Sequence, residues 1–182
     1  MVRRETPSEA PPGKADQSVW AARWSKAQPW VALVLRLGLA AVALAAALPK
    51  LGDLRAFQRS VAAYEIFPMG INNLIGVAVP IVELVIAVVL VAGLLTRYAA
   101  AVFGLMMLVF IVGIAQAWAR GLNIACGCFE IGGTLGPDEK AQYGIEIARD
   151  VGLALLAAVL MIWPASPASL DQRLRVDPVG FA

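Results

Sequence analysis

The two cysteines of the chain, Cys126 and Cys128, are separated by Gly127 alone and are the first candidates for chemistry. A disulfide between positions i and i+2 closes a small, strained ring, and strain makes a disulfide more oxidising. Gly127 tolerates backbone angles that other residues avoid. Such a bridge closes almost no loop, so it adds little stability through chain entropy. The spacing therefore favours thiol–disulfide exchange over a structural role.

Two other readings of the cysteines stay open at this point. Two thiolates could hold Cu(I), which prefers soft sulfur ligands. Zinc would need two further ligands, and the chain has no histidine to supply them. The thiols could also be small buried hydrophobic groups. No metal site is assigned, and the absence of histidine also excludes histidine-ligated haem and Cys–His nucleophile pairs.

The composition indicates a membrane protein. Hydrophobic residues make up 60% of the chain and the mean hydropathy is +0.74, whereas an average soluble domain is about 45–50% apolar. Charged residues make up only 15%, and the net charge is +2. This small charge gives no electrostatic basis for binding nucleic acid. Membrane lipid is therefore the expected surrounding.

Four apolar stretches have about the length of ~20 residues that crosses a bilayer as a helix. Inside lipid the backbone must pair internally, so each stretch is expected to be helical. The predicted fold is an all-α, integral membrane four-helix bundle over residues 29–163. Its helices are expected at 29–48, 73–95, 98–118 and 145–163, between a flexible polar tail at 1–28 and a C-terminal tail at 164–182.

The loop between the first two stretches contains a fifth helical pattern. Leu54, Phe57, Val61 and Tyr64 recur at helical spacing and predict a short amphipathic helix on the membrane surface. Five Lys and Arg residues precede the first stretch, so both termini are expected in the cytoplasm. Helix parity then places the short helix and the cysteine loop together on the extracytoplasmic side, where disulfides persist.

Three charged residues near this face could support the cysteines. The Lys50 ammonium could favour a thiolate, or the side chain could extend to the membrane interface. Asp53 could orient Lys50 or accept a proton, although its position also suits the N-cap of the short helix. Asp150 could act as a base, or it could complement the helix dipole at the start of the last helix.

Arg36 and Glu83 are charges within the apolar stretches. An unpaired charge in lipid is costly, so these two residues are predicted to form a structural ion pair inside the bundle. Pro80, one turn before Glu83, frees a backbone carbonyl and is expected to bend that helix. A proton-relay role for Glu83 is the alternative.

The order of these features resembles the MauE/DoxX family of bacterial membrane proteins, and the MauE branch most closely. The resemblance runs over roughly residues 30–163. It rests on Arg36 with Gly38, "KLGD" at 50–53, "FQRSVAAYEIFP" at 57–68, "PIVE" at 80–83, "CGCF" at 126–129 and "RD" at 149–150. It implies a four-helix protein of the bacterial inner membrane that works with a thioredoxin-like extracytoplasmic partner in maturing disulfide-containing proteins.

The function expected from the residues and the resemblance together is a membrane-embedded thiol–disulfide relay, a possible oxidoreductase using Cys126 and Cys128. Chemical analogy to other four-helix thiol oxidases suggests a quinone as the further electron carrier. Neither the direction of electron flow nor the attacking cysteine follows from the sequence. The alternatives are an assembly subunit of a larger membrane complex and a Cu(I)-handling protein.

Overall fold

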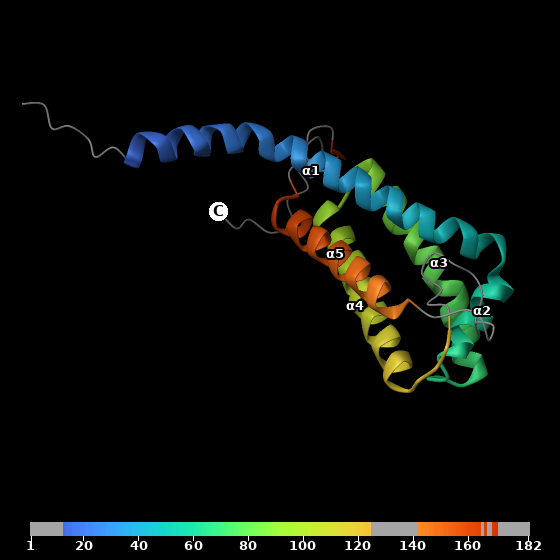
Figure 1. The fold of residues 1–182 in the computed structure, drawn as a ribbon. Helices are drawn as coiled ribbons and strands as arrows, with labels where there is room; N and C mark the ends of the chain where they lie inside the picture. Colours follow the sequence, from blue (N-terminus) through green and yellow to red (C-terminus); the bar gives the residue numbers. More distant parts are fainter. Residues whose placement is uncertain (1–12, 125–141, 165, 167–168, 171–182) are drawn as a thin grey trace, which may run out of the picture.

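A computed structural model describes residues 13–124 and 142–164, with Ser166, Ser169 and Leu170. The described residues form an all-α protein with five helices, as predicted (Figure 1). The helices are α1 (Gly13–Gly52), α2 (Leu54–Ala63), α3 (Met69–Ala92), α4 (Thr96–Ala119) and α5 (Tyr143–Ile162). The predicted short amphipathic helix is α2, between the first two long helices.

Helix boundaries follow local signals. α1 begins at Gly13, well before the predicted start at residue 29, and it continues through Pro29 and Pro49. Pro68 is the N-cap of α3, and Gly93 ends that helix in the left-handed conformation, with φ of 64°. Glycine adopts this conformation without steric penalty. Because Leu95 is the N-cap of α4, the turn between α3 and α4 is very short.

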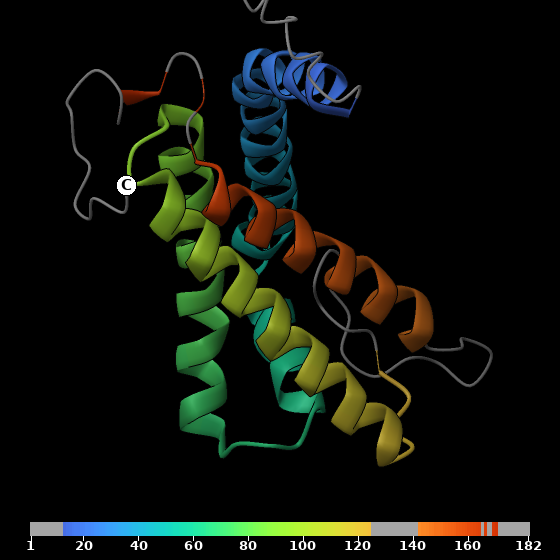
Figure 2. The ribbon, with the colours of Figure 1, turned by 90° about the vertical axis from the view of Figure 1, so that its left-hand side faces the viewer.

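The long helices pack in two pairs. α4 lies beside α5, and α1 lies beside α3, as Figures 1 and 2 show from two directions. Small buried side chains, including Ala43, Ala87, Ala100 and Ala157, share the core with Leu90 and Phe103. Small residues let helix backbones approach closely, which favours association where water cannot drive it.

Three helical segments are long and apolar enough to cross a membrane: Ala27–Gly52, Met69–Ala92 and Thr96–Ala119. Large apolar side chains such as Val34, Val88 and Val112 are exposed on their outer faces. This pattern is the one expected where lipid surrounds the helices. The described residues thus form a membrane protein with three candidate spans. α5 carries Glu146, Arg149 and Asp150 in its first half, and its crossing of the membrane stays a prediction.

α2 rests closely on α3. A Cβ added at Gly76 of α3 would lie 2.4 Å from Gln58 Cγ and 3.1 Å from Gln58 Cα of α2. The buried face of α2 contains Ala56, Phe57 and Ser60. We call the region where α1 ends, α2 lies, α3 and α5 begin and α4 ends the α2 end of the molecule. Of the residues predicted to support the cysteines, Lys50 and Asp53 lie at this end.

Candidate functional site

The described chain stops at the α2 end, just before the cysteine-bearing segment. Cys126 and Cys128 lie outside the described residues, but Ile124, two positions before Cys126, is described and buried. The Tyr143 hydroxyl accepts a hydrogen bond from the Ile124 N–H at 3.0 Å and donates to the Leu122 carbonyl. The first residue of α5 therefore anchors the chain just before the first cysteine.

A buried ion pair lies at the same end. Lys50 Nζ is 2.5 Å from Glu83 Oε1, and both side chains are almost fully buried, with 1% and 2% exposed. Lys50 Nζ also lies over the Phe57 and Phe110 rings, 5.0 and 5.5 Å from their centroids. A cation over an aromatic face is attracted by the ring, and more strongly where water is excluded. Lys50 thus points inward and does not extend to the membrane interface.

The predicted pairing of Arg36 with Glu83 is wrong, because Lys50 occupies that place. Arg36 precedes Lys50 by fourteen residues, or about 21 Å along a helix, so both cannot reach Glu83. The Arg36 guanidinium instead donates to the Ser166 hydroxyl at 2.9 Å. It also packs against Gly93, where an added Cβ would lie 2.0 Å from Arg36 Nη1. Arg36 therefore joins α1 to the α3–α4 turn and to the segment after α5.

The second carboxylate oxygen of Glu83 has a different environment from the first. Glu83 Oε2 is buried and has no hydrogen-bond partner among the residues that the structure describes. Buried carboxylate oxygens are usually hydrogen-bonded, so such an atom is uncommon. Within the described part of the chain, Glu83 therefore has one carboxylate oxygen paired with Lys50 and one without a hydrogen-bond partner.

Asp53 acts as a helix cap. Its carboxylate accepts a hydrogen bond from the Ala56 N–H at 2.9 Å, at the start of α2. N-capping satisfies one of the free backbone donors of a helix. This geometry bears out the capping interpretation. A chemical role for Asp53 toward the cysteines stays a prediction.

Asp150 lies deeper in its helix than the sequence suggested. α5 begins at Tyr143, so Asp150 is two turns from the helix start, and Glu146 is the acidic residue of the first turn. Dipole stabilisation falls off within the first turn, so the dipole explanation is wrong for Asp150. Its carboxylate is 1% exposed and pairs with Arg149, whose Nη2 is 2.9 Å away. A role for Asp150 as a base stays a prediction.

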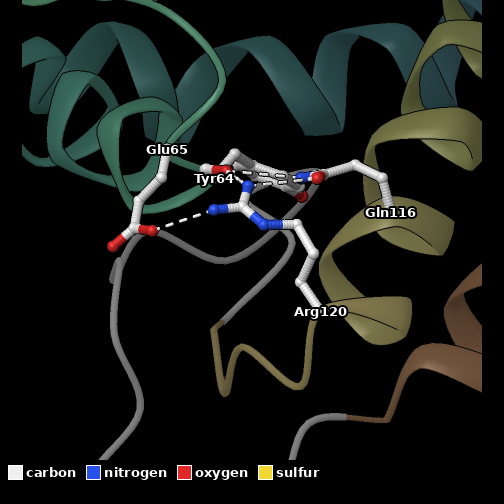
Figure 3. Close-up of polar contacts among 4 residues, drawn as sticks. All are labelled: Tyr64, Glu65, Gln116 and Arg120. Carbon is white, nitrogen blue, oxygen red and sulfur yellow. Dashed lines mark hydrogen bonds and ion pairs between the residues drawn. The ribbon is translucent and has the colours of Figure 1, made fainter.

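A polar clasp formed by Tyr64, Glu65, Gln116 and Arg120 joins α2 to α4 (Figure 3). Arg120 donates to the Tyr64 carbonyl at 3.0 Å and to Glu65 Oε2 at 3.0 Å. The Gln116 amide donates to the same carbonyl at 3.3 Å. Glu65 has a positive φ of 52°, which is uncommon for a residue with a side chain. The clasp fixes the turn after α2 beside the end of α4.

Sequence reasoning missed Tyr143, Gln116 and Arg120. Gln116 was the detectable signal, since it is a polar side chain within a long apolar run. Tyr143 precedes the predicted fourth stretch and has no periodic pattern that would single it out. Long-range contacts bring Tyr143 and Gln116 to the α2 end.

The described residues contain no group of three or more Cys, Asp and Glu side chains able to hold a metal ion. At the α2 end they provide the Lys50 ammonium with its aromatic neighbours. They also hold in place the residues directly before the cysteine-bearing segment. Within the described residues the Lys50 ammonium is paired with the Glu83 carboxylate. A role for Lys50 toward the cysteines stays a prediction.

The chain is similar in sequence to known proteins. A family model described as methylamine utilisation protein MauE matches residues 28–164. The methylamine utilization protein MauE of Paracoccus denitrificans is 33% identical over 147 residues, which make up 80% of this chain and 77% of that protein. No solved structure matches.

Proposed function

The chain belongs to the MauE family, and from this premise we propose that it is a membrane-embedded thiol–disulfide relay. Cys126 and Cys128 would exchange electrons with a thioredoxin-like extracytoplasmic protein. Following the name of the family, we place the relay in methylamine utilisation, where it supports maturation of disulfide-containing proteins. The observation that carries the proposal is the anchoring of Leu122 and Ile124 by Tyr143, directly before the cysteine pair.

The topology belongs to the same proposal. α5 serves as a fourth span of the bacterial inner membrane, beside the three candidate spans. The termini then lie in the cytoplasm and the α2 end faces outward. This orientation exposes the cysteine segment to an oxidising compartment, where a disulfide can persist.

Exchange proceeds through a mixed disulfide. A thiolate of one protein attacks the disulfide of the other, forming one S–S bond and releasing one thiolate. The second cysteine of the attacking protein then attacks the mixed disulfide and releases the other protein. The attacking protein now carries the disulfide, and the other protein has gained two electrons and carries the dithiol. We assign the first contact with the partner to Cys128, because it precedes the turn-rich sequence "IGGTLGPDE", and resolution to Cys126.

Removing the resolving thiol should trap the intermediate. We expect Cys126→Ser to accumulate a covalent adduct with a partner, seen on non-reducing gels of membranes and lost on adding dithiothreitol. Cys128→Ser should accumulate less, and the double Cys126→Ser/Cys128→Ser variant none.

The opposite result would identify another function. If neither single variant forms an adduct, and cells with the double variant mature disulfide-bonded proteins normally, the relay is excluded. An assembly subunit of a larger membrane complex, which needs neither cysteine, is the alternative that would then take its place.

A further inference from the structure

A lateral pocket of about 300 Å³ lies at the α2 end, among α2, α3, α4 and the turn after α2. Its aromatic walls are Phe57, Phe67, Phe110 and the Tyr64 ring, and the rest of its lining is almost entirely aliphatic. This volume is at the small end of the ~300–1,000 Å³ typical of ligand pockets. An aromatic and aliphatic lining suits an apolar ring better than a charged molecule.

The pocket is reached from the lipid side. Val109 and Val112, which line it, are 61% and 68% exposed on α4, a candidate membrane span. Ile66 and Phe67, from the turn after α2, are each 46% exposed. A ligand would therefore enter from the bilayer and must be soluble in lipid.

One polar group in the lining distinguishes a carbonyl compound from a plain hydrocarbon chain. Gln116 lines the pocket, and its NH₂ group has two N–H donors, of which one bonds to the Tyr64 carbonyl. The other donor can serve a ligand carbonyl. In a pocket that is otherwise apolar, a few placed polar groups fix a ligand's orientation.

The pocket also adjoins the residues assigned to the relay. Its Phe57 and Phe110 rings are the same rings that lie under the Lys50 ammonium. Its Tyr64 and Phe110 side chains pack against the buried cluster that contains Ile124 and Tyr143. The pocket wall is thus continuous with the anchored residues that directly precede the cysteine-bearing segment.

We propose that this pocket binds the ring of a membrane quinone, which accepts electrons from the cysteine pair. The step is Cys126–SH plus Cys128–SH plus quinone giving the disulfide plus hydroquinone, so that two electrons and two protons pass from the thiols to the two quinone oxygens. The reoxidised relay then oxidises its protein partner by the reverse of the exchange described above: a partner thiolate attacks Cys128 in the relay disulfide and releases Cys126, and the partner's second thiol then releases Cys128. The redox step rests on the proposed relay function, whereas binding of the ring depends only on the pocket.

Two glycines of α4 provide a matched test. Cβ atoms added at Gly113 and at Gly104 would each meet their nearest neighbour at 3.5 Å, an ordinary contact. Gly113 lines the lateral pocket and faces the Tyr64 ring, whereas Gly104 lines a different groove, between α4 and α5. Gly113→Val should therefore fill the quinone pocket, and Gly104→Val applies the same substitution to the same helix elsewhere.

The probe is decylubiquinone, titrated into the purified full-length protein in detergent, with quenching of intrinsic tryptophan and tyrosine fluorescence as the readout. We expect saturable binding to the wild type, an increase of at least tenfold in Kd for Gly113→Val, and an unchanged Kd for Gly104→Val. Gln116→Leu should raise Kd about fivefold, and thermal unfolding checks that each variant is folded. Quenching that never saturates, or equal Kd values for the two glycine variants, would overturn the proposal.

Two further measurements separate an acyl-chain site and a failed relay from the proposed site. Decanol has the same tail without the ring, and competition by decanol as strong as by decylubiquinone would identify an acyl-chain site and overturn the quinone.

The Cys126→Ser/Cys128→Ser variant should bind decylubiquinone as the wild type does but should not reduce it. Adducts in the trapping experiment without quinone binding would leave the relay standing and remove the quinone. Binding without any reduction by the reduced wild-type protein would overturn the redox step.

Discussion

At the scale of single residues, the pairing of Lys50 with Glu83 is the main electrostatic feature of the described structure. Both side chains are buried between helices, and the Phe57 and Phe110 rings exclude water from the ammonium. In such a setting, loss of one partner leaves an uncompensated charge, which costs far more than loss of the pair as a whole.

Single changes to this pair should therefore destabilise the protein more than the double change. We expect Lys50→Met and Glu83→Leu each to lower the free energy of unfolding by about 3–5 kcal/mol, and the double variant to lose less than either single variant. Thermal unfolding in detergent, followed by circular dichroism, measures all three. Additive losses would show that the two residues are not coupled.

Two controls are available on the same chain. Glu65, which pairs with Arg120, is 64% exposed, and surface pairs contribute about 0–1 kcal/mol, so Glu65→Gln should have little effect. Arg36 lies about 21 Å along α1 from Lys50, and distant sites act independently. Arg36→Leu should therefore add to Glu83→Leu without coupling, in contrast to Lys50→Met.

At the scale of elements, the position of α2 depends on the absence of a side chain at Gly76. The Gln58 backbone of α2 would be 3.1 Å from a Cβ at this position, and its Cγ would be closer still. A backbone atom cannot move away by rotating a side chain, so α2 and α3 must move apart by a few tenths of an ångström. α2 carries Phe57 and leads into the clasp, and its position therefore decides the shape of the α2 end.

Gly76→Ala should lift α2 from α3. We expect a loss of about 1–3 kcal/mol, as for other overpacked sites. Arg55 and Arg59 are exposed on α2, so limited trypsin digestion should cut after them faster in the variant. Gly70→Ala, in the same helix with nothing within 4 Å of the added Cβ, is the control and should digest at the wild-type rate. Equal digestion of the two variants would show that α2 is not held by this contact.

At the scale of the whole molecule, the direction of α5 decides on which side the chain ends. The three candidate spans alone would leave the segment after α4 and the C-terminus on the same side of the membrane. A fourth crossing by α5 separates them. α5 packs along α4 over its length, and its last half is apolar, which supports a crossing despite the charges in its first half (Figure 2).

Cysteine labelling tests this crossing. In the Cys126→Ser/Cys128→Ser background, Gly144→Cys at the start of α5 should react with a membrane-impermeant maleimide in intact cells, and Ile162→Cys at its end only after lysis. Met69→Cys, 77% exposed at the start of α3, should label like Gly144→Cys because both lie at the α2 end. Labelling of Gly144→Cys and Ile162→Cys from the same side would contradict a crossing by α5. In the wild type, reduced Cys126 or Cys128 should label from outside.

Local features of this protein followed from the sequence alone. Hydropathy determined the three candidate spans, and the spacing of Leu54, Phe57, Val61 and Tyr64 determined α2. The cap at Asp53 was also predictable, because a cap involves residues only three positions apart. These features depend on neighbours along the chain, and the sequence shows those neighbours directly.

The partners of the buried charges were decided by the tertiary structure. An apolar run defines a helix but leaves its register against other helices open, and a shift of one turn moves a side chain by about 5.4 Å. Glu83 therefore meets Lys50, and Arg36 meets Ser166, although the apolar patterns allowed the pairing of Arg36 with Glu83 equally well. Tyr143 and the lateral pocket are of the same kind. They exist only because helices far apart in the sequence come together at the α2 end, and the packing of side chains, which no local pattern encodes, sets how they meet.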